Sequence, residues 1–318
     1  MNMAENMERK ILVAIGNTGL DKTTVNYLIH LFQDSTNVKL HLLTIIPLYD
    51  VSESQQLLDD IETVALSHPA ALKKRSEARK HLADIEKQLR DAGFKEEQIQ
   101  SEALFTFESV SAALLRQGKA GAYGAMVLGK RDLSLLEKMI KGSISSDLWR
   151  KDHSVPLWLV SGNPQSRDFL VPVDCSIHTC NAVDHLGFIL QDSPEAQVTL
   201  FHSCSLLAAE DITPREKFHA RWGKEWCDQH LQGDEGGHFH FEATEQMLKE
   251  SGIPTDNIHR LEIKAGIEPA QMIVREVKKK SYGTIVMGRR LDKEKNIFKG
   301  VSDRVLANVH DVALWIVG

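Results

Sequence analysis

Glycine and hydroxyl residues in the middle of the chain have the spacing of a phosphate-binding loop. The apolar segment 125–128 ends at Gly129, a charged stretch follows, and Gly142, Ser143 and Ser145 then open an amphipathic helix. Glycines let a backbone approach a ligand closely, and the N–H groups at a helix N-terminus favour an anion. The segment predicts an anion site at the carboxyl end of a parallel strand. The alternative is a capped turn and helix that bind nothing.

A shorter copy of this loop lies near the end of the chain. The apolar segment 284–287 ends at Gly288, and Gly300 and Ser302 follow at similar spacing. Both loops carry basic residues that are suited to phosphate, although solvated surface charge is the expected role for at least two of them. These basic residues are Lys130, Arg131, Arg289 and Arg290.

Apolar runs that alternate with amphipathic segments predict the elements that hold the loops. Each half reads strand, helix, strand, helix, strand, helix, strand, loop, helix, strand. In the first half, the strands are expected at 11–15, 38–46, 99–105, 123–128 and 155–160. Residues 48–70 are expected to form a long polar connection with a helical patch near 57–64. Such alternation predicts an α/β fold, with a mostly parallel sheet and helices on both faces.

The second half repeats landmarks of the first. Asp174 corresponds in position to Gly16, and Gly252 corresponds to Gly93. The apolar run 312–317 corresponds to the run 155–160. Each landmark of the second half lies between 157 and 159 residues after its counterpart in the first. The sequence therefore predicts an internal duplication, with domains at residues 1–162 and 163–318 separated by a turn-rich linker.

Composition excludes several classes of protein. The chain has 318 residues, 42% hydrophobic and 26% charged, as in soluble globular proteins. Its net charge of −6 disfavours nucleic acid and anionic membranes as partners. We expect no signal peptide and no membrane span. The four cysteines, Cys175, Cys180, Cys204 and Cys227, form no CxxC pair, so reduced thiols and a cytoplasmic location are expected.

These features resemble the universal stress protein family over almost all of both halves. Nucleotide-binding members carry an aspartate at the end of the first strand and a Gly-x2-Gly-x9-Gly-Ser/Thr loop after the fourth. Gly129, Gly142 and Ser143 match that loop, and Asp174 matches the aspartate. The resemblance implies two repeats of a five-stranded parallel sheet of the Rossmann-like, adenine-nucleotide-binding type. It further implies that the last strands of the two halves pair, giving an internal pseudo-dimer.

Each half departs from the family pattern at a different place. In the first half Gly16 replaces the strand-end aspartate and Asp132 replaces the second loop glycine. In the second half Leu291 replaces that glycine and Val301 replaces the hydroxyl residue. The first half thus keeps the phosphate part of the pattern, and the second keeps the base and ribose part.

The resemblance implies binding of ATP or a related adenine nucleotide, with Mg²⁺ as a possible companion. The implied site residues of the first half are Ala14, Ile15, Ile45, Leu128, Gly129, Arg131, Gly142, Ser143, Ile144 and Ser145. Those of the second half are Pro172, Val173, Asp174, Ser203, Met287, Gly288, Arg290, Gly300 and Ser302. For Asp174 the alternative is a turn or a helix cap.

Two functions of different class remain open. The first is a stress-response sensor or regulator that binds an adenine nucleotide. The second is a scaffold in which both loops are relics and segments 48–70 and 204–240 contact an unknown protein partner, with a homodimer left open. The sequence contains no P-loop lysine and no HExxH or GxSxG motif, so it favours binding over catalysis. Slow ATP hydrolysis is the weaker third alternative.

Other residues with chemical potential have ordinary structural explanations. Four side chains are of types that bind zinc: Cys227, His230, His238 and His240. An extended strand would place the last two on one side. The spacing of the four matches no common zinc pattern. A solvated polar loop is therefore expected there. Cys175 is expected to be a buried, inert thiol rather than a redox-sensitive one. Trp158 and Trp315 are expected to pack at an interface of the halves.

Overall fold

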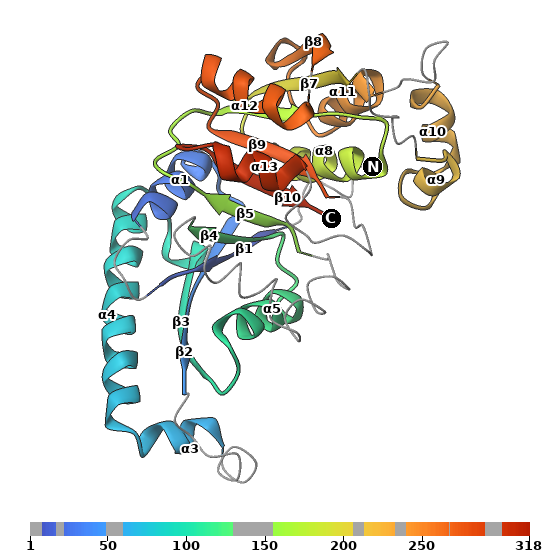
Figure 1. Ribbon diagram of the computed structural model, residues 1–318. Helices are drawn as coiled ribbons and strands as arrows, with labels where there is room; N and C mark the ends of the chain where they lie inside the picture. The colour runs from blue at the N-terminus through green and yellow to red at the C-terminus, as the bar shows by residue number, and fades with distance from the viewer. Residues whose placement is uncertain are drawn as a thin grey trace. The chain divides into compact units, whose positions relative to one another are not determined.

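The computed structural model describes residues 8–16, 22–48, 60–129, 155–205, 213–232, 240–266, 268–289 and 301–318 (Figure 1). The chain divides into two compact units, Met1–Asn163 and Pro164–Gly318. Each unit is an α/β structure built on a parallel sheet.

Unit 1 has five described strands, all parallel, in the order β3-β2-β1-β4-β5. Their bounds are Arg9–Ala14 for β1, Val38–Pro47 for β2, Ile99–Thr106 for β3, Ala125–Gly129 for β4 and Leu157–Val160 for β5. Ile11, Leu12 and Val13 of β1 are fully buried, because the strand has neighbours on both sides and helices over both faces. This is why β1 reads as a continuous apolar run rather than an alternating one.

The helices of unit 1 connect these strands. They are α1 (Lys22–Phe32), α3 (Ile61–Leu66), α4 (Pro69–Asp91) and α5 (Val110–Ala120), with a 3-10 turn, η1, at Glu96–Gln98. Pro69 begins α4, where its missing N–H costs nothing, and Gly93 follows the helix at φ +99°, a conformation that glycine adopts freely.

The helical patch expected near 57–64, inside the connection at 48–70, is present as a short helix. Residues 61–66 form α3, and α4 begins at Pro69. The reason is burial: Val64 and Ala65 pack with Ile46 and Phe105 in one apolar cluster, and the Asp60 side chain accepts a hydrogen bond from the Glu62 N–H to cap α3. Residues 49–59 lie outside the described part.

Unit 2 repeats this strand order with its own strands, as β8-β7-β6-β9-β10, again all parallel. The strands are β6 (Asp168–Pro172), β7 (Gln197–Ser205), β8 (Ile258–Gly266), β9 (Thr284–Gly288) and β10 (Ala313–Val317). The helices are α8 (Ile177–Leu190), α9 (Glu216–Trp222), α10 (Lys224–His230), α11 (His240–Glu250), α12 (Pro269–Lys279) and α13 (Val301–Asn308), with η3 at Thr255–Asn257.

Main-chain hydrogen bonds recur at matching positions in the two units. The Gly124 N–H donates to the Lys10 carbonyl at 2.8 Å, and the Gly283 N–H donates to the Asp168 carbonyl at 3.0 Å. Gly252 follows α11 at φ +89°, as Gly93 follows α4. The matched bonds show that the same local geometry is built twice. The expected assignment of 163–318 as a second domain of the same family stays a prediction.

Among the described residues, each unit has one completely buried tryptophan. Trp158 stacks on Phe32 with ring centroids 6.3 Å apart, and Trp315 meets Phe169 and His185 edge-on at 5.7 Å. Both rings therefore pack inside their own unit, and the expected place at an interface of the halves stays a prediction.

His185 makes unit 2 sensitive to acid. Burial lowers the pKa of His185 from 6.5 to about 3, and the charge of Arg221 adds to the shift. The unfolded chain binds a proton below pH 6.5 while the folded unit does not, so stability falls as pH falls from 6.5 toward 3, by about 1.4 kcal/mol per pH unit. Replacing His185 by Gln should remove this slope from the free energy of unfolding, measured by urea denaturation between pH 7 and pH 5. An unchanged slope would show that His185 titrates normally in the folded chain.

Candidate functional site

The candidate site of unit 1 lies where its strand order reverses. The chain runs from β1 outward to β2 and β3, then returns to place β4 on the other side of β1. Open α/β sheets bind ligands at the carboxyl ends of strands at such a switch point. The register pairs Leu12 with Met126 and Val13 with Val127, so the carboxyl ends of β1 and β4 lie side by side.

The strand-end residues expected from the sequence meet at this point and form an apolar wall. Ala14 is 8% exposed, Ile15 3%, Ile45 6% and Leu128 0%, while Gly129 is half-buried at the end of β4. An apolar wall of this kind suits a flat aromatic group better than a charged one.

Hydrogen bonds hold the end of β1 in place. The Ile15 N–H donates to the Leu43 carbonyl at 2.9 Å, and the Thr44 hydroxyl donates to the Ile15 carbonyl at 3.1 Å. The Ile15 N–H is thereby used, while the Ile15 carbonyl, which accepts one bond, keeps a second lone pair.

The loop part of the expected site falls outside the described residues. In unit 1 these residues are Arg131, Gly142, Ser143, Ile144 and Ser145, together with Lys130 and Asp132. In unit 2 they are Arg290 and Gly300, together with Leu291. Their phosphate-binding role stays a prediction.

Unit 2 brings its own expected residues to the matching switch point between β6 and β9. Val173 and Met287 are buried, at 5% and 6% exposed. The half-buried members of the set are Pro172, Asp174, Ser203, Gly288 and Ser302. The Ser203 hydroxyl oxygen is shielded from solvent and has no hydrogen-bond partner within the described part of the chain.

Asp174 is engaged in starting α8. Its Oδ1 accepts hydrogen bonds from the Ser176 N–H at 3.0 Å, from the Ser176 hydroxyl and from the Thr179 hydroxyl at 2.6 Å. Ser176 in turn caps the helix by accepting from the Thr179 N–H at 3.3 Å. These bonds are the turn and cap chemistry that the sequence left open as the alternative role of Asp174.

Gly288 has a packing reason to be glycine. A Cβ at this position would come within 2.3 Å of the carbonyl group of His178, in the first turn of α8. Because backbone cannot yield as a flexible side chain can, α8 can lie this close to β9 only where the strand ends in glycine. The glycine therefore gives no independent support for phosphate binding in unit 2.

The solvated polar loop expected around the zinc-type residues is wrong for its described part, which contains α10 and the start of α11. Cys227 is buried in α10 and His230 ends that helix. The expectation of an extended strand at His240 is wrong, because His240 opens α11, and His238 lies outside the described residues. Within the described ranges, no three or more His, Cys, Asp or Glu side chains lie close enough to hold a metal ion.

The described cysteines are buried thiols. Cys175 and Cys180 are 2% and 1% exposed. Burial raises the pKa of Cys180 to about 12, and the charge of Asp174 adds to that shift. Because the thiolate is the reactive form, Cys180 is inert at neutral pH.

Sequence reasoning missed a polar cluster near the opposite, amino-terminal edge of the sheet of unit 1. His41 Nδ1 hydrogen-bonds the Tyr123 hydroxyl, and His41 Nε2 lies 3.5 Å from a Glu102 carboxylate oxygen. The Lys10 ammonium lies 4.6 Å from the centre of the Tyr123 ring. The available signal was the presence of Lys10 and His41 inside otherwise apolar strands.

Residues 7–160 match the model of the universal stress protein family. These residues form a universal stress protein domain. They contain the switch point of unit 1 and every described site residue there. The family model does not extend to the second unit.

Solved structures of universal stress proteins resemble the chain. One from Archaeoglobus fulgidus DSM 4304 has 16% sequence identity and a TM-score of 0.60, covering 99% of this chain and 97% of its own. At that identity the likeness concerns the fold. A universal stress protein in complex with cAMP has 15% identity and a TM-score of 0.33, covering 48% of this chain and 96% of its own. None of the curated proteins compared with the chain matches its sequence.

A search of the described helices for a membrane span finds none with enough length and apolar character to cross a bilayer.

Truncating Asp174 should destabilise unit 2 in the absence of any ligand. Asp174→Ala removes the acceptor of three hydrogen bonds at the start of α8, which should cost about 1–2 kcal/mol. Asp174→Asn keeps an oxygen acceptor and should cost less. Urea denaturation of both variants at pH 7 measures the difference, and an Ala variant as stable as the parent would contradict the capping role.

Proposed function

We propose that the universal stress protein domain at residues 7–160 binds an adenine nucleotide, as part of a stress-response sensor or regulator. The observation that carries this proposal is the set of buried apolar residues at the switch point of its sheet, where β1 and β4 end together. Ala14, Ile15 and Ile45 would line the base pocket, with the fully buried Leu128 packed beneath them in the sheet. Their fit to a flat ring, rather than to a metal or a charged group, supports a nucleotide as the ligand.

The phosphates would extend from this wall toward the loop that follows Gly129. Glycine at the end of β4 allows close approach, and the segment at Gly142, Ser143 and Ser145 would supply N–H and hydroxyl donors. Asp132 would repel the phosphates, so a compensating charge is needed. Arg131 or a bound Mg²⁺ supplies it, which favours ATP with magnesium over a free nucleotide.

We further propose that unit 2 is a second, degenerate domain of the same type with a structural role. Its strand order and matched main-chain bonds support common descent with unit 1. The engagement of Asp174 in the start of α8 and the packing requirement at Gly288 favour a scaffold function for this unit over nucleotide binding. Pairing of the last strands, at 155–160 and 312–317, and homodimer formation remain predictions from the family resemblance.

The proposal concerns binding rather than turnover, in a cytoplasmic protein. A scaffold needs a partner, and the surfaces predicted to meet one are those of segments 48–70 and 204–240. Slow ATP hydrolysis would require a base that activates water, and the proposal assigns that role to no residue.

Titration calorimetry with ATP and Mg²⁺ tests the assignment to one unit. We expect micromolar binding to the parent chain, with one nucleotide per chain. Gly142→Glu places a carboxylate in the phosphate loop of the first half and should weaken binding at least tenfold, or about 1.4 kcal/mol. Gly300→Glu introduces the same charge at the matching glycine of the second half and should leave affinity unchanged.

If Gly300→Glu weakens binding and Gly142→Glu does not, the nucleotide binds in unit 2. In that case Asp174→Ala should weaken nucleotide binding as well. Absence of heat with the parent chain, and no nucleotide retained on purification, would contradict the nucleotide proposal and favour the scaffold. Circular dichroism of each variant verifies that the fold is intact before affinities are compared.

A further inference from the structure

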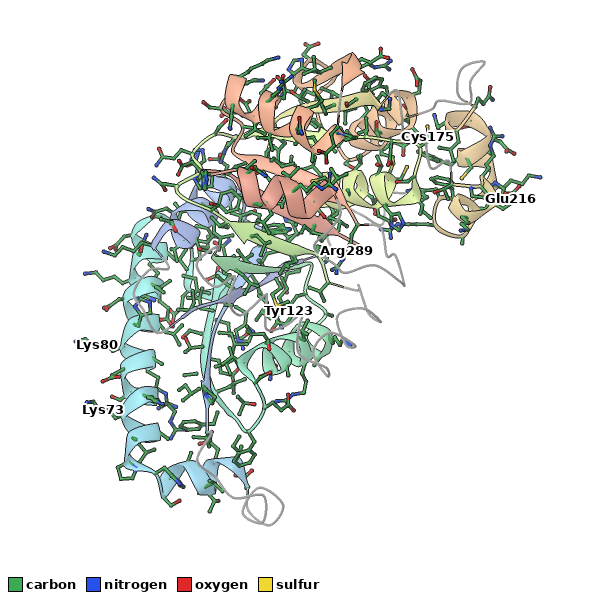
Figure 2. The ribbon with its side chains drawn as sticks, viewed as in Figure 1. Lys73, Lys80, Tyr123, Cys175, Glu216 and Arg289 are labelled. Carbon is green, nitrogen blue, oxygen red and sulfur yellow. The ribbon has the colours of Figure 1, made fainter. Side chains whose placement is uncertain are left out.

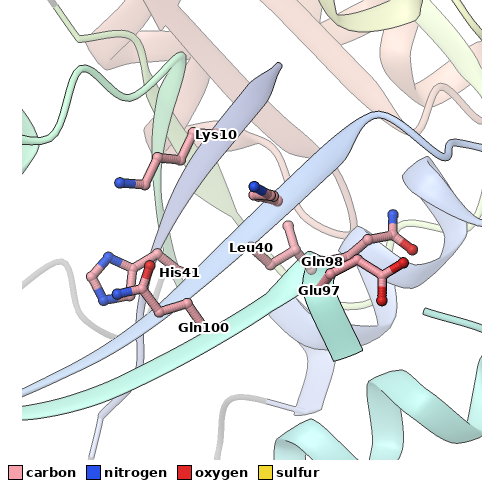
Figure 3. A pocket seen from close by; sticks show the side chains of 7 residues that line it. Lys10, Leu40, His41, Glu97, Gln98 and Gln100 are labelled. Atoms are coloured by element: carbon pink, nitrogen blue, oxygen red, sulfur yellow. The ribbon is translucent and has the colours of Figure 1, made fainter. Parts of the chain in front are cut away.

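A small pocket lies at the amino-terminal edge of the sheet of unit 1, at the opposite end of the strands from the candidate nucleotide site. It encloses about 140 Å³ and is lined by Lys10, Lys39, Leu40, His41, Glu97, Gln98 and Gln100 (Figure 3). Because a water molecule occupies about 30 Å³ in the liquid, this volume holds a ligand of a few heavy atoms. It is too small for a nucleotide, whose pockets usually exceed about 300 Å³.

The walls of the pocket are held in place by hydrogen bonds. The Gln98 amide donates to the Ser35 and Val38 carbonyls, both at 3.2 Å, and its oxygen accepts from the Lys95 N–H at 3.0 Å. The His41 ring is held by the Tyr123 hydroxyl. These bonds fix Gln98 and His41, whereas Lys39, Glu97 and Gln100 are exposed and would be ordered by a ligand at some cost in affinity.

Two ammonium groups belong to this lining. Lys10 Nζ lies over the face of the Tyr123 ring at 4.6 Å from its centre, a contact that orients the cation without neutralising it. Lys39 Nζ lies 2.7 Å from a carboxylate oxygen of Glu8. Glu97 is the acidic member of the lining, and it opposes an anion there.

His41 adds a buried ring nitrogen that lies beside the Glu102 carboxylate. The residue is 4% exposed, and its Nε2 has no hydrogen bond within the described residues, although Glu102 lies 3.5 Å away. Burial lowers the pKa of His41, against the opposing influence of Glu102, so the ring is neutral at physiological pH. A buried polar atom without a partner has a free-energy cost that a bound ligand would remove.

Unit 2 shows that the fold does not require these basic residues. By strand register, Asp168 and Gln197 are paired at the start of β6 and β7, as Lys10 and Lys39 are paired in β1 and β2. Tyr282 occupies the place of Tyr123, and burial raises the pKa of its hydroxyl while a hydrogen bond with Thr199 opposes that shift. The same framework thus accepts an acid where unit 1 has Lys10. The positive charge is specific to unit 1.

We propose that this pocket binds a small oxyanion, a carboxylate or a phosphate, between Lys10 and Lys39. Lys10 provides the main attraction, because Lys39 is paired with Glu8, and the Gln100 amide and the His41 ring would provide hydrogen bonds. Because Glu8, Glu97 and Glu102 all oppose an anion, we expect an affinity on the order of millimolar. The site is separate from the proposed nucleotide site and does not depend on it.

Nuclear magnetic resonance of the intact chain tests this site directly. The imidazole signals of His41 are followed while inorganic phosphate or acetate is added at constant ionic strength and pH 7.5. We expect a saturable shift with at least one of the two probes, and their relative affinities show whether the site prefers phosphate or carboxylate. Lys10→Met should weaken binding several-fold, whereas Glu97→Gln should strengthen it because a repulsive charge is removed.

Lys80→Met is the matched control. Lys80 is an exposed lysine on α4 (Figure 2), so its loss changes the net charge equally and should leave the affinity unchanged. A shift that never saturates, or equal effects of Lys10→Met and Lys80→Met, would overturn the proposal. If Lys10→Met does not fold, the exposed Glu97 offers a second variant for the same test. Unchanged or weaker binding of the anion by Glu97→Gln would also contradict the proposal.

Discussion

The structure of unit 1 depends on the burial of its central strand. β1 has a parallel neighbour on each side, and Ile11, Leu12 and Val13 are removed from solvent on both faces. Because β1 cannot shift without breaking two ladders of hydrogen bonds, the ends of β1, β2 and β4 hold fixed positions. The apolar wall at their carboxyl ends and the polar cluster near their amino ends are both consequences of this one arrangement.

The two units use one framework with different side chains at its edges. At the carboxyl edge both units have apolar strand ends, and unit 2 has Asp174, tied into the first turn of α8, where unit 1 has Gly16. At the amino edge, unit 1 has Lys10 where unit 2 has Asp168. The sheet thus accepts different side chains at both edges, and in unit 2 Asp174 serves the fold. This asymmetry is the basis for assigning different roles to the two halves.

Much of the strand framework could be predicted from the sequence because buried parallel strands appear as continuous apolar runs. The run at Ile11–Ile15 and the recurring Gly93 and Gly252 have direct structural causes in β1 and in the residues that follow α4 and α11. A helical patch near residues 57–64 could be predicted, but the bounds of α3 could not, since they depend on Val64 and Ala65 meeting distant strands. The close contact of Gly288 with His178 and the Asp174 network also arise only in three dimensions.

The central claim is that an adenine nucleotide binds at the switch point of unit 1 and not at that of unit 2. Photolabelling with 8-azido-ATP and Mg²⁺, followed by peptide mapping, tests it most directly because the reactive group is on the base. The account predicts that label is displaced by excess ATP and maps to peptides from the ends of β1, β2 and β4. Displaceable label confined to residues 164–318, or no displaceable label at all, would contradict it.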